Sequence, residues 1–404
     1  MSADGPSQPG GTAAPAFPGF GARLSLFYGT YFLLLGVLAP FWPLFLSGRG
    51  LDAGQIGLLL GTTLWARMVA GPLTALVVDG TGNPRLVVTL SALATLGLAF
   101  ALFGVTGFGP TFALSFSYYF MLSGMLPLVE AITLRGAAAF RGYGRIRLWG
   151  SITFVSAAFV AGLALEAYGS LSPETILWLV VIATAFVALS APLLPNLNPP
   201  RQKLRSEPFR RLLASPPFLL MMLSAGLIQG GHAVQFGFGS LRWAEAGYPS
   251  WLIGLLWAEA SAAEILLFAY GGRLVERLGP SRLLGIAGGL GALRWLVLGV
   301  TTELWAVVPA QLLHAANFGA MHLGAMLFIA RAVGPGYANV GQSLYSGLTF
   351  GAMTGGAMLL AGWLYALSPF GAYAAAAALS AGGAAAALAL GFAWRGAVIG
   401  APAR

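Results

Sequence analysis

Twelve apolar stretches follow one another along this 404-residue sequence, and each is long enough to cross a lipid bilayer. About 20 apolar residues in a helix, rising about 1.5 Å each, cover the roughly 30 Å hydrocarbon core. The stretches are 24–46, 55–78, 86–106, 111–134, 148–166, 175–194, 217–240, 251–271, 283–301, 304–330, 341–366 and 371–394. Backbone polar groups must be satisfied inside a bilayer, and the alternating ten-residue strands of a barrel are absent. The sequence therefore predicts an all-α membrane protein with twelve transmembrane helices.

Composition excludes several classes of protein. Only 8% of the residues are charged and 58% are hydrophobic, whereas a soluble domain carries about 25% charged residues. The absence of cysteine excludes disulfides, thiolate metal sites and cysteine nucleophiles. The single lysine, Lys203, is not part of a Gly-Lys-Ser/Thr motif, so ATP hydrolysis through a P-loop is excluded. Zincin motifs and nucleophile elbows are missing too, so we expect neither enzymatic activity nor a cofactor or metal.

The basic residues predict the topology. The net charge of +9 comes from residues scattered through short connections, which does not suit a nucleic-acid-binding face. With a cytoplasmic N-terminus, 17 of the 21 basic residues fall on the cytoplasmic side, and Arg49 and Arg242 fall on the other. The positive-inside rule then places both termini in the cytoplasm. Residues 1–22 lack the basic and apolar regions of a signal peptide, so we expect a multi-pass protein of a bacterial inner membrane.

An internal repeat divides the chain into halves. The pattern Gly-x5-Ile-Gly-Leu-Leu at residues 50–59 recurs 197 residues later at residues 247–256. The predicted organisation is a disordered cytoplasmic tail at 1–22, a six-helix half at 23–194, a cytoplasmic linker at 195–216, a second six-helix half at 217–394 and a cytoplasmic tail at 395–404. A parallel repeat of two halves, with substrate bound near the midplane between them, is typical of transporters.

Both halves carry an acidic residue and a downstream arginine between two membrane spans, at the same offset of 197 residues. These candidate gating residues are Asp79 and Arg85 in the first half and Glu276, Arg277 and Arg282 in the second. An acid at the end of one helix can pair with arginine and cap the next helix, which would lock the halves in one state. Ordinary helix capping is the alternative interpretation.

Eight ionisable side chains lie inside the apolar stretches, away from the ends of those stretches. They are Arg67, Glu130, His232, Glu259, Glu264, Arg294, His314 and His322. A charge inside a spanning helix costs about 2.5–3.5 kcal/mol even on lenient insertion scales, so such residues normally line a water-filled path, a substrate site or a proton relay. The pattern indicates a membrane transporter for a small molecule.

One candidate site lies in the first half. Glu130 is one turn past Pro127 and shares a helical stripe with Tyr119 and Ser123, while Arg147 opens the next span. An acid and an arginine held close together in a low dielectric form a strong but breakable pair, and a substrate can replace either partner. We expect Glu130 and Arg147 to contact substrate. Alternatively, Glu130 only ends its helix near the headgroups.

A second candidate site lies in the other half. Gln311, His314 and His322 form one stripe on the tenth span, and Glu264 and Arg294 lie on neighbouring spans. A change in the Glu264–Arg294 distance would drive proton uptake and release. Histidine titrates near neutrality and suits the same relay. We expect Glu264, Arg294, His314 and His322 to couple protons, although each histidine is also consistent with hydrogen-bonded packing.

Other polar and aromatic residues are weaker candidates. Gln229 and His232, one turn apart, and Tyr345 are expected to contact substrate, with interhelical hydrogen bonding as the alternative. Glu259 precedes Glu264 by five positions, about 140° around the helix, so the two do not share a face. Trp65, Tyr28, Tyr31 and Phe154 are candidates for an aromatic pocket.

The run at 143–151, Tyr-Gly-Arg-Ile-Arg-Leu-Trp-Gly-Ser, resembles the start of helix five in the lactose permease branch of the major facilitator superfamily. From about Leu24 to Trp394, the chain more closely resembles the 3-phenylpropionate/proton symporter group of that superfamily. The matching segments are Phe41-Trp42-Pro43, 56–61 with Arg67, Pro127-Leu128 before Glu130, 145–151, His232, Glu264, Arg294-Trp295, 311–314, His322-Leu323 and Tyr345-Ser346. The second gating segment resembles the superfamily's signature loop, whereas Gly80 replaces the basic residue after Asp79 in the first.

The resemblance implies the major facilitator fold, alternating access, a monomer in the bilayer, and proton symport of an aromatic carboxylate such as 3-phenylpropionate. A proton gradient would drive transport, and Arg67 or Arg147 would bind the carboxylate. By analogy with lactose permease, Glu130 and Arg147 correspond to its sugar-contacting pair, and Arg294 and His314 to its coupling arginine and histidine. The proton-carrying acid of that permease is replaced by Asn317 here. Coupling must therefore use another acid, for which Glu264 is the candidate, or be absent.

Other functions fit the same fold, namely sugar or nucleoside symport and drug export. A polytopic membrane enzyme acting on lipid is the alternative from another class. Such an enzyme would carry clustered histidines or acids at one membrane face, or a large soluble loop. The charges here are spread over both halves and the loops are short.

Overall fold

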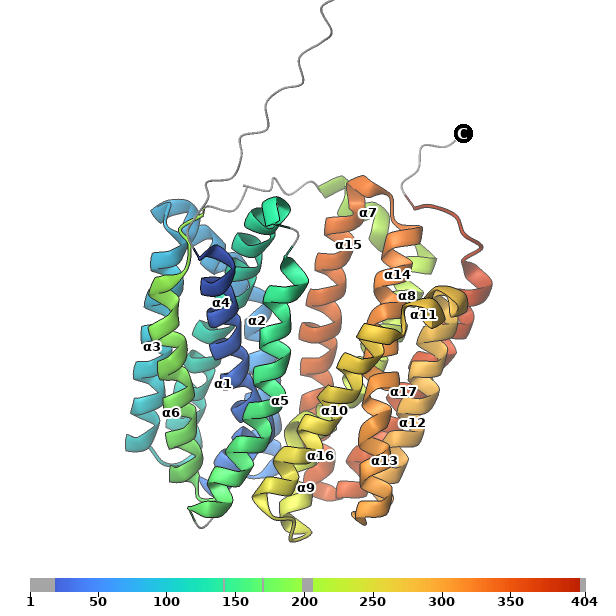
Figure 1. Ribbon diagram of the computed structural model, residues 1–404. Coiled ribbons are helices and arrows are strands. Elements are labelled where there is room, and N and C mark those ends of the chain that lie inside the picture. Colours follow the sequence, from blue (N-terminus) through green and yellow to red (C-terminus); the bar gives the residue numbers. More distant parts are fainter. Residues whose placement is uncertain (1–18, 141, 169–170, 198–205, 400–404) are drawn as a thin grey trace, which may run out of the picture.

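The computed structural model describes residues 19–140, 142–168, 171–197 and 206–399, and these form a bundle of roughly parallel and antiparallel helices (Figure 1). Twelve helices or helix chains in these ranges are long and apolar enough to span a membrane, which confirms the predicted fold class. The predicted tails and linker lie partly outside the described residues, at 1–18, 198–205 and 400–404. Arg141, Arg201, Lys203, Arg205 and Arg404, which entered the topology prediction, also lie outside them.

The first half contains six spans. They are α1 (Phe20–Gly48), α2 (Ala53–Thr81), α3 (Pro84–Ala101, extended by a 3-10 turn at Leu102–Gly104), α4 (Phe108–Phe140), α5 (Tyr143–Ala167) and α6 (Pro173–Ser190, extended by a 3-10 turn at Ala191–Leu193). The observed helices begin and end within a few residues of the predicted stretches, because apolar length sets the span.

The second half contains six further spans, three of them interrupted. The continuous spans are α10 (Ser250–Tyr270), α12 (Pro280–Val300) and α17 (Pro369–Ala393). The interrupted spans join α8 (Pro216–Val234) to α9 (Ser240–Glu245), α13 (Leu304–His314) to α14 (Ala320–Ala332), and α15 (Ala338–Tyr345) to α16 (Thr354–Leu367). The joining segments are π-helical: η3 (Gln235–Gly239), η4 (Ala315–Gly319) and η6 (Ser346–Met353). Such π segments within α-helices occur frequently at functional sites.

Local sequence signals set several helix starts. Asp52 and Gln55 form a reciprocal capping box at the start of α2, with the Gln55 amide N–H donating to Asp52 Oδ1 at 2.8 Å. Proline occupies the first turn of α3, α6, α8, α12 and α17, where its missing N–H costs nothing. The repeat is also visible in the backbone, since Gly50 and Gly247 both adopt left-handed conformations, with φ of 83° and 82°.

The two halves meet along two seams, α2 against α16 and α5 against α10. Glycine allows the close approach. A Cβ at Gly57 would lie 2.7 Å from Gly362 Cα, and one at Gly254 would lie 2.2 Å from Ala158 O. These contacts lie at the end of the bundle away from the termini, and the ribbons of the two halves diverge towards the other end (Figure 1). The glycines of the sequence repeat thus hold the halves together at one end.

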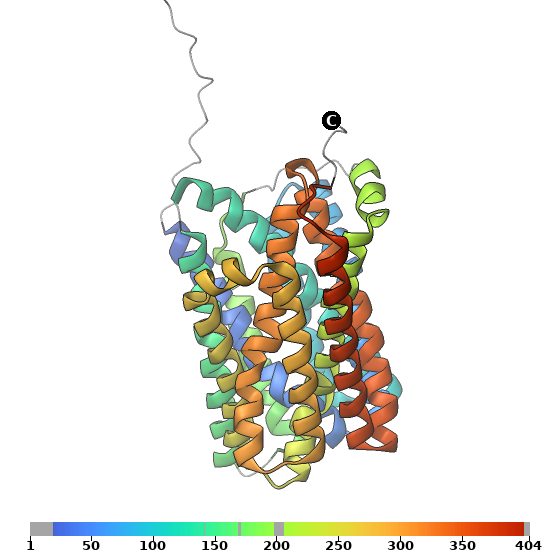
Figure 2. The same ribbon diagram turned by 90° about the vertical axis from the view of Figure 1, so that its right-hand side faces the viewer.

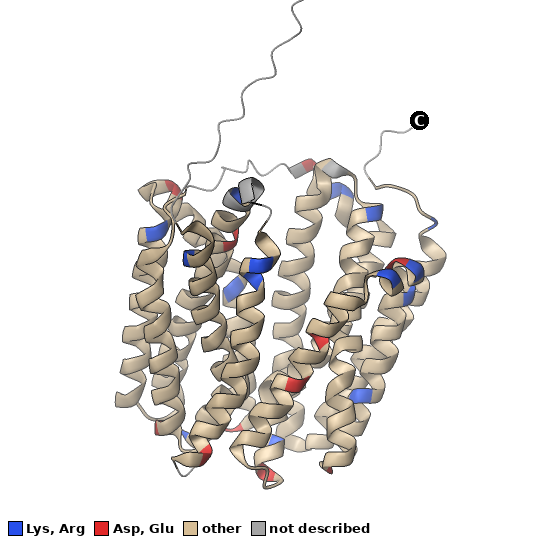
Figure 3. Ribbon diagram, viewed as in Figure 1, with Lys and Arg blue, Asp and Glu red and all other residues tan. Residues whose placement is uncertain are grey.

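Charge is distributed unevenly along the bundle. Lys and Arg gather at one end of the bundle, while acidic residues predominate at the opposite end (Figure 3). The basic end is the one where α1 begins and where the described chain ends after α17 (Figure 2). Arg49, at the opposite end, pairs with Glu174 at 3.6 Å. This asymmetry is what the positive-inside rule anticipates for cytoplasmic termini, which stays a prediction.

Two segments predicted as linker or loop contain helix. Within the predicted linker, α7 (Ser206–Leu213) is a short helix in which Glu207 pairs with Arg211 at 2.8 Å and accepts a hydrogen bond from the Tyr337 hydroxyl at 2.9 Å. This hydrogen bond to an acid raises the pKa of Tyr337. The second gating segment forms α11 (Gly272–Leu278), which carries Glu276 and Arg277.

The N-cap positions of α3 and α12 are occupied by residues other than the candidate gating residues. Asn83 caps α3 by accepting from the Leu86 amide at 3.0 Å, and Gly279 precedes α12 without a side-chain cap. Asp79 instead lies near the end of α2, and Arg85 and Arg282 in the first turns of α3 and α12. Among the described residues, Glu276, Arg277 and Arg282 form no ion pair in this conformation. The gating role and the capping alternative both stay predictions.

Arg242 stabilises the end of α12, and replacing it with alanine is expected to lower the melting temperature in detergent. Its Nε and Nη2 donate to Leu298 O and Gly299 O at 3.1 and 2.8 Å, so a positive charge caps a helix C-terminus. Hydrogen bonds from charged groups are worth about 1.5–3 kcal/mol. A thermal-shift assay measures the effect, with R331A at an exposed arginine as the control. Equal melting temperatures for R242A and R331A would contradict this role.

Candidate functional site

A cavity of about 410 Å³ lies between the two halves. Aromatic side chains from both halves contribute to its wall beside aliphatic ones, among them Trp42, Tyr119 and Phe154 from the first half and Phe236 and Trp257 from the second. Of the predicted aromatic candidates, Tyr31 and Phe154 line the cavity and Tyr28 and Trp65 do not. An apolar chamber with a few polar groups is the usual form of a small-molecule site.

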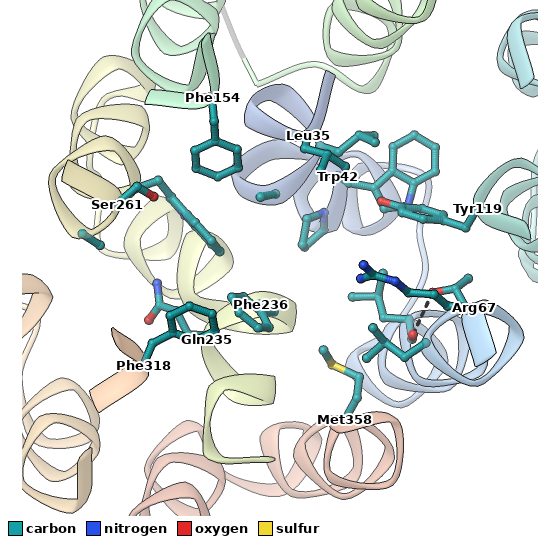
Figure 4. Close-up of a pocket in the computed structure, with 18 of the residues that line it drawn as sticks. Leu35, Trp42, Arg67, Tyr119, Phe154, Gln235, Phe236, Ser261, Phe318 and Met358 are labelled. Atoms are coloured by element: carbon teal, nitrogen blue, oxygen red, sulfur yellow. Dashed lines mark hydrogen bonds between the residues drawn. The ribbon is translucent and has the colours of Figure 1, made fainter. Parts of the chain in front are cut away.

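Arg67 extends into this cavity from α2. Its side chain is exposed and makes no ion pair or hydrogen bond with any residue in the described part of the chain. Tyr119 and Trp42 lie on the same side of the cavity (Figure 4). The Trp42 indole N–H has no hydrogen-bond partner among the described residues. A guanidinium, a phenol and an indole thus place hydrogen-bond donors on one wall.

The opposite half contributes a charged network to the cavity. Glu264 Oε2 lies 3.5 Å from His314 Nε2, and His314 Nδ1 lies 3.2 Å from Arg294 Nη1. All three side chains line the cavity. The carboxyl group and the guanidinium that were predicted on neighbouring spans are therefore joined through the imidazole ring of His314.

Arg294 is held rigidly by neutral partners. It is 1% exposed, donates to Gln311 Oε1 at 2.9 Å and to Asn317 Oδ1 at 3.5 Å, and lies 4.3 Å over the Trp295 ring. Asn317 in turn donates to Ala287 O at 3.2 Å. Asn317 therefore orients the arginine without carrying a proton, and Glu264 is the carboxyl group that contacts this network through His314.

The predicted polar stripe on the tenth span continues beyond the cavity. The His314 and Phe318 rings stack at 5.3 Å, and the Phe318 and His322 rings at 6.3 Å. His322 Nδ1 lies 3.0 Å from the Tyr345 hydroxyl. Neither His322 nor Tyr345 lines the cavity, so the structure places the predicted substrate contact of Tyr345 one layer behind it.

The predicted Glu130–Arg147 site is not part of the cavity. Arg147 lies 4.0 Å over the Phe32 ring, and no ion pair joins it to Glu130 among the described residues. Tyr119 and Ser123 line the cavity, whereas Glu130, about three turns further along α4 on the same stripe, does not. The helix α4 also continues past Glu130, so this residue does not end its helix. A direct substrate contact by this pair is not supported in this conformation.

Gln229 and His232 also lie behind the cavity wall. His232 is fully buried, its Nδ1 lies 3.2 Å from Ile228 O, and its ring meets His314 at 5.4 Å. Gln229 is 2% exposed and does not line the cavity. Glu259 is on the far side of α10 from Glu264 and does not line it either, as the helical geometry predicted.

Sequence reasoning missed Gln235 as a site residue. It begins the π segment η3, and both it and the adjacent Phe236 line the cavity. A signal was present, since Gln235 continues the spacing of Gln229 and His232 by three residues, and Phe-Gly occurs in all three π segments. In the described ranges, no three His, Asp or Glu side chains gather closely enough to hold a metal ion.

Comparisons with known proteins agree with this architecture. The family described as "MFS_1 like family" matches residues 22–375. The chain is 31% identical over 351 residues to the probable 3-phenylpropionic acid transporter of Escherichia coli (strain K12), covering 85% of this chain and 90% of that protein. It is 27% identical over 343 residues to the maltose permease of Geobacillus stearothermophilus, covering 84% and 86%.

Solved structures show the same fold at low sequence identity. The nucleoside transporter NupG matches with a TM-score of 0.78 at 16% identity, covering 93% of this chain and 99% of that one. A bacterial homolog of the human lysosomal transporter Spinster, in an inward-facing and unoccupied conformation, matches with a TM-score of 0.68 at 18% identity, covering 95% and 96%.

Proposed function

The chain belongs to the MFS_1 like family of membrane transporters, and from this premise we propose that it carries an aromatic carboxylate across the membrane in symport with a proton. The single observation that carries the substrate class is an unpaired guanidinium, Arg67, in a largely apolar cavity whose wall includes several aromatic side chains. A 31% identical relative is described as a probable 3-phenylpropionic acid transporter, which supports the same class.

Arg67 would bind the carboxylate. Guanidinium and carboxylate form charge-assisted, often bidentate hydrogen bonds, and these are strong in an apolar chamber. Tyr119, on the same wall, would donate a further hydrogen bond, and the Phe154, Phe236 and Trp257 rings would pack against the aromatic ring of the substrate. Size supports this assignment, since 410 Å³ lies within the range of small-molecule pockets.

Glu264 and His314 would carry the proton. The pair lies in the cavity wall beside Arg294, so a change in the distance between these groups during alternating access would change the proton affinity of the carboxyl group. Histidine passes protons readily near neutral pH. His322 and Tyr345 extend the polar stripe away from the cavity and would lead the proton towards the end with the termini.

The proposed setting is a bacterial inner membrane, with a monomeric transporter and both termini in the cytoplasm. The basic residues at the end with the termini support this orientation (Figure 3). In that orientation the halves are packed together on the outer side and diverge towards the cytoplasm, as in an inward-facing state.

Uptake of radiolabelled 3-phenylpropionate into proteoliposomes tests the proposal. Because the neutral acid crosses bilayers unaided, initial rates are compared with those of protein-free liposomes. We expect a protein-dependent rate that an inward proton gradient increases several-fold. A protein-dependent rate without gradient stimulation would indicate a facilitator, and no protein-dependent uptake would reject the substrate class. Maltose and nucleosides then become the next substrates to test, because related or similarly folded proteins are described as their transporters.

Replacing Arg67 with glutamine is expected to raise the apparent KM for 3-phenylpropionate at least about tenfold, because hydrogen bonds to charged groups are worth about 1.5–3 kcal/mol. R67K keeps the positive charge but loses the bidentate geometry, so its KM should lie between that of the wild type and that of R67Q. R331Q at an exposed position serves as the matched control. An unchanged KM in R67Q would remove Arg67 from carboxylate binding.

A further inference from the structure

Gln235 is a buried amide without a partner. It is 3% exposed, and neither Nε2 nor Oε1 has a hydrogen-bond partner among the described residues, although the side chain lines the central cavity. Buried polar groups in native proteins are nearly always hydrogen-bonded, and leaving one unsatisfied is unfavourable. The partner of this amide is therefore expected to be something that enters the cavity.

The fold holds this amide in place. Gly239, one turn further along, has no side chain, and a Cβ there would lie 2.4 Å from Gln235 Nε2. The amide thus occupies a niche that only glycine leaves free. The next residue, Phe236, stacks on Trp257, with 6.1 Å between the ring centroids. Gln235 and Phe236 are the first two residues of the π segment η3, and both line the cavity.

Gln235 and Arg67 belong to opposite halves of the protein. Arg67 extends from α2, Gln235 from η3, and Phe236 lies between them in the view of Figure 4. An aromatic carboxylate bound at Arg67 would place its ring among the aromatic side chains and the far edge of that ring near Gln235. The amide is therefore placed to recognise a substituent at the ring end of the substrate.

The chemistry of the amide narrows that substituent. A primary amide offers both a donor and an acceptor. A carboxylate only accepts and an ammonium group only donates, so each would leave one atom of the amide unsatisfied. A hydroxyl group does both and is small enough to fit beside an aromatic ring. A site built to bind a hydroxyl discriminates strongly against the analogue that lacks it.

We propose that Gln235 is a specificity-determining residue that hydrogen-bonds a hydroxyl group at the ring end of the substrate, so that the preferred substrate is a ring-hydroxylated aromatic carboxylate. The inference rests on the proposed function, because it takes the carboxylate at Arg67 as given. It goes further in assigning the second polar group of the substrate and the residue that recognises it.

Competition assays test this assignment. Initial uptake of radiolabelled 3-phenylpropionate into proteoliposomes is inhibited with unlabelled 3-phenylpropionate and with its 2-, 3- and 4-hydroxyphenyl analogues. For the wild type we expect at least one hydroxylated analogue to inhibit at about tenfold lower concentration than the parent acid. In Q235L the ratio of the two inhibitory concentrations should fall to about one, because leucine keeps the volume and removes both hydrogen bonds.

The ratio is internal to each variant, so a general loss of folding or expression does not change it. Q342L is the matched control, since it makes the same exchange at an exposed glutamine that does not line the cavity, and its ratio should equal that of the wild type. A wild-type ratio near one for all three isomers, or an unchanged ratio in Q235L, would overturn the inference and leave the carboxylate site standing. Absence of protein-dependent 3-phenylpropionate uptake in the wild type would instead reject the proposed function, and this inference with it.

Discussion

Replacing Glu264 with glutamine is expected to abolish the stimulation of 3-phenylpropionate uptake by an inward proton gradient while leaving exchange of internal for external substrate largely intact. Glutamine has the shape of the protonated carboxyl group but cannot release a proton. The 3.5 Å contact with His314 places Glu264 in the network that also contains Arg294, within the cavity wall. The variant should therefore still change conformation with substrate bound, without responding to pH.

Two assays on the same proteoliposomes separate these effects. A gradient of one pH unit corresponds to a driving force of about 1.4 kcal/mol, or about tenfold, for one proton. The wild type should show a gradient-stimulated initial rate, and E264Q should show none while its counterflow stays within about twofold to threefold of the wild type. E259Q is the matched control, because it is the same exchange on the same helix at a residue that does not line the cavity. Normal stimulation in E264Q would remove Glu264 from coupling.

Replacing Gly254 with leucine is expected to hold the protein open at the end away from the termini and to reduce transport about 30-fold or more. A Cβ at Gly254 would lie 2.2 Å from Ala158 O on α5, so the α5–α10 seam cannot close around a larger side chain without moving backbone. Overpacking typically costs about 1–3 kcal/mol, and 2 kcal/mol shifts a two-state equilibrium about 30-fold. The conformation in which both seams are closed would no longer be the most populated one.

Labelling of a single cysteine measures this shift, because the chain has no native cysteine. Ala39 lines the cavity on α1, and A39C should react several-fold faster with an impermeant maleimide, applied from the end away from the termini, when G254L is present. G285L is the matched control, since a Cβ at Gly285 meets nothing within 4 Å. Equal labelling rates in the G254L and G285L backgrounds would show that this seam does not control access.

The spans could be predicted from the sequence because hydrophobic thickness alone sets their length. The stretch predicted at 304–330, for example, is observed at Leu304–Ala332. The π segments within that span and two others could not be predicted in the same way. A π segment has i→i+5 hydrogen bonds in place of the i→i+4 bonds of an α-helix, and the apolar length of a span does not distinguish the two.

The positions of the site residues were predicted only in part. Arg67, Glu264, Arg294 and His314 line the cavity, whereas Glu130, Arg147, Gln229, His232, His322 and Tyr345 lie outside its wall. Spacing along one helix shows which residues share a face, but it does not show how far along the helix the cavity extends. Tyr119 and Glu130 were therefore predicted on one stripe, although only Tyr119 lines the cavity. Gln235 was missed although it continues the three-residue spacing of Gln229 and His232, because that spacing alone does not show which of the three residues reaches the cavity.

The seam contacts are related by the sequence repeat in a way that bears on the origin of the chain. Gly162 approaches Ser250 at one seam and Gly362 approaches Ala53 at the other, and Ala53 and Ser250 are themselves 197 residues apart. Each half therefore contributes two equivalent surfaces, α2 and α5 from the first half and α10 and α16 from the second. The α2 surface packs on α16 and the α5 surface packs on α10, which is the arrangement of an isologous dimer. A single six-helix unit with both surfaces would be self-complementary. If the gene for such a homodimer were duplicated and fused, the interface between the halves would already exist. The interior could then become asymmetric, with Arg67 on one wall and Glu264 on the other, while that interface is retained.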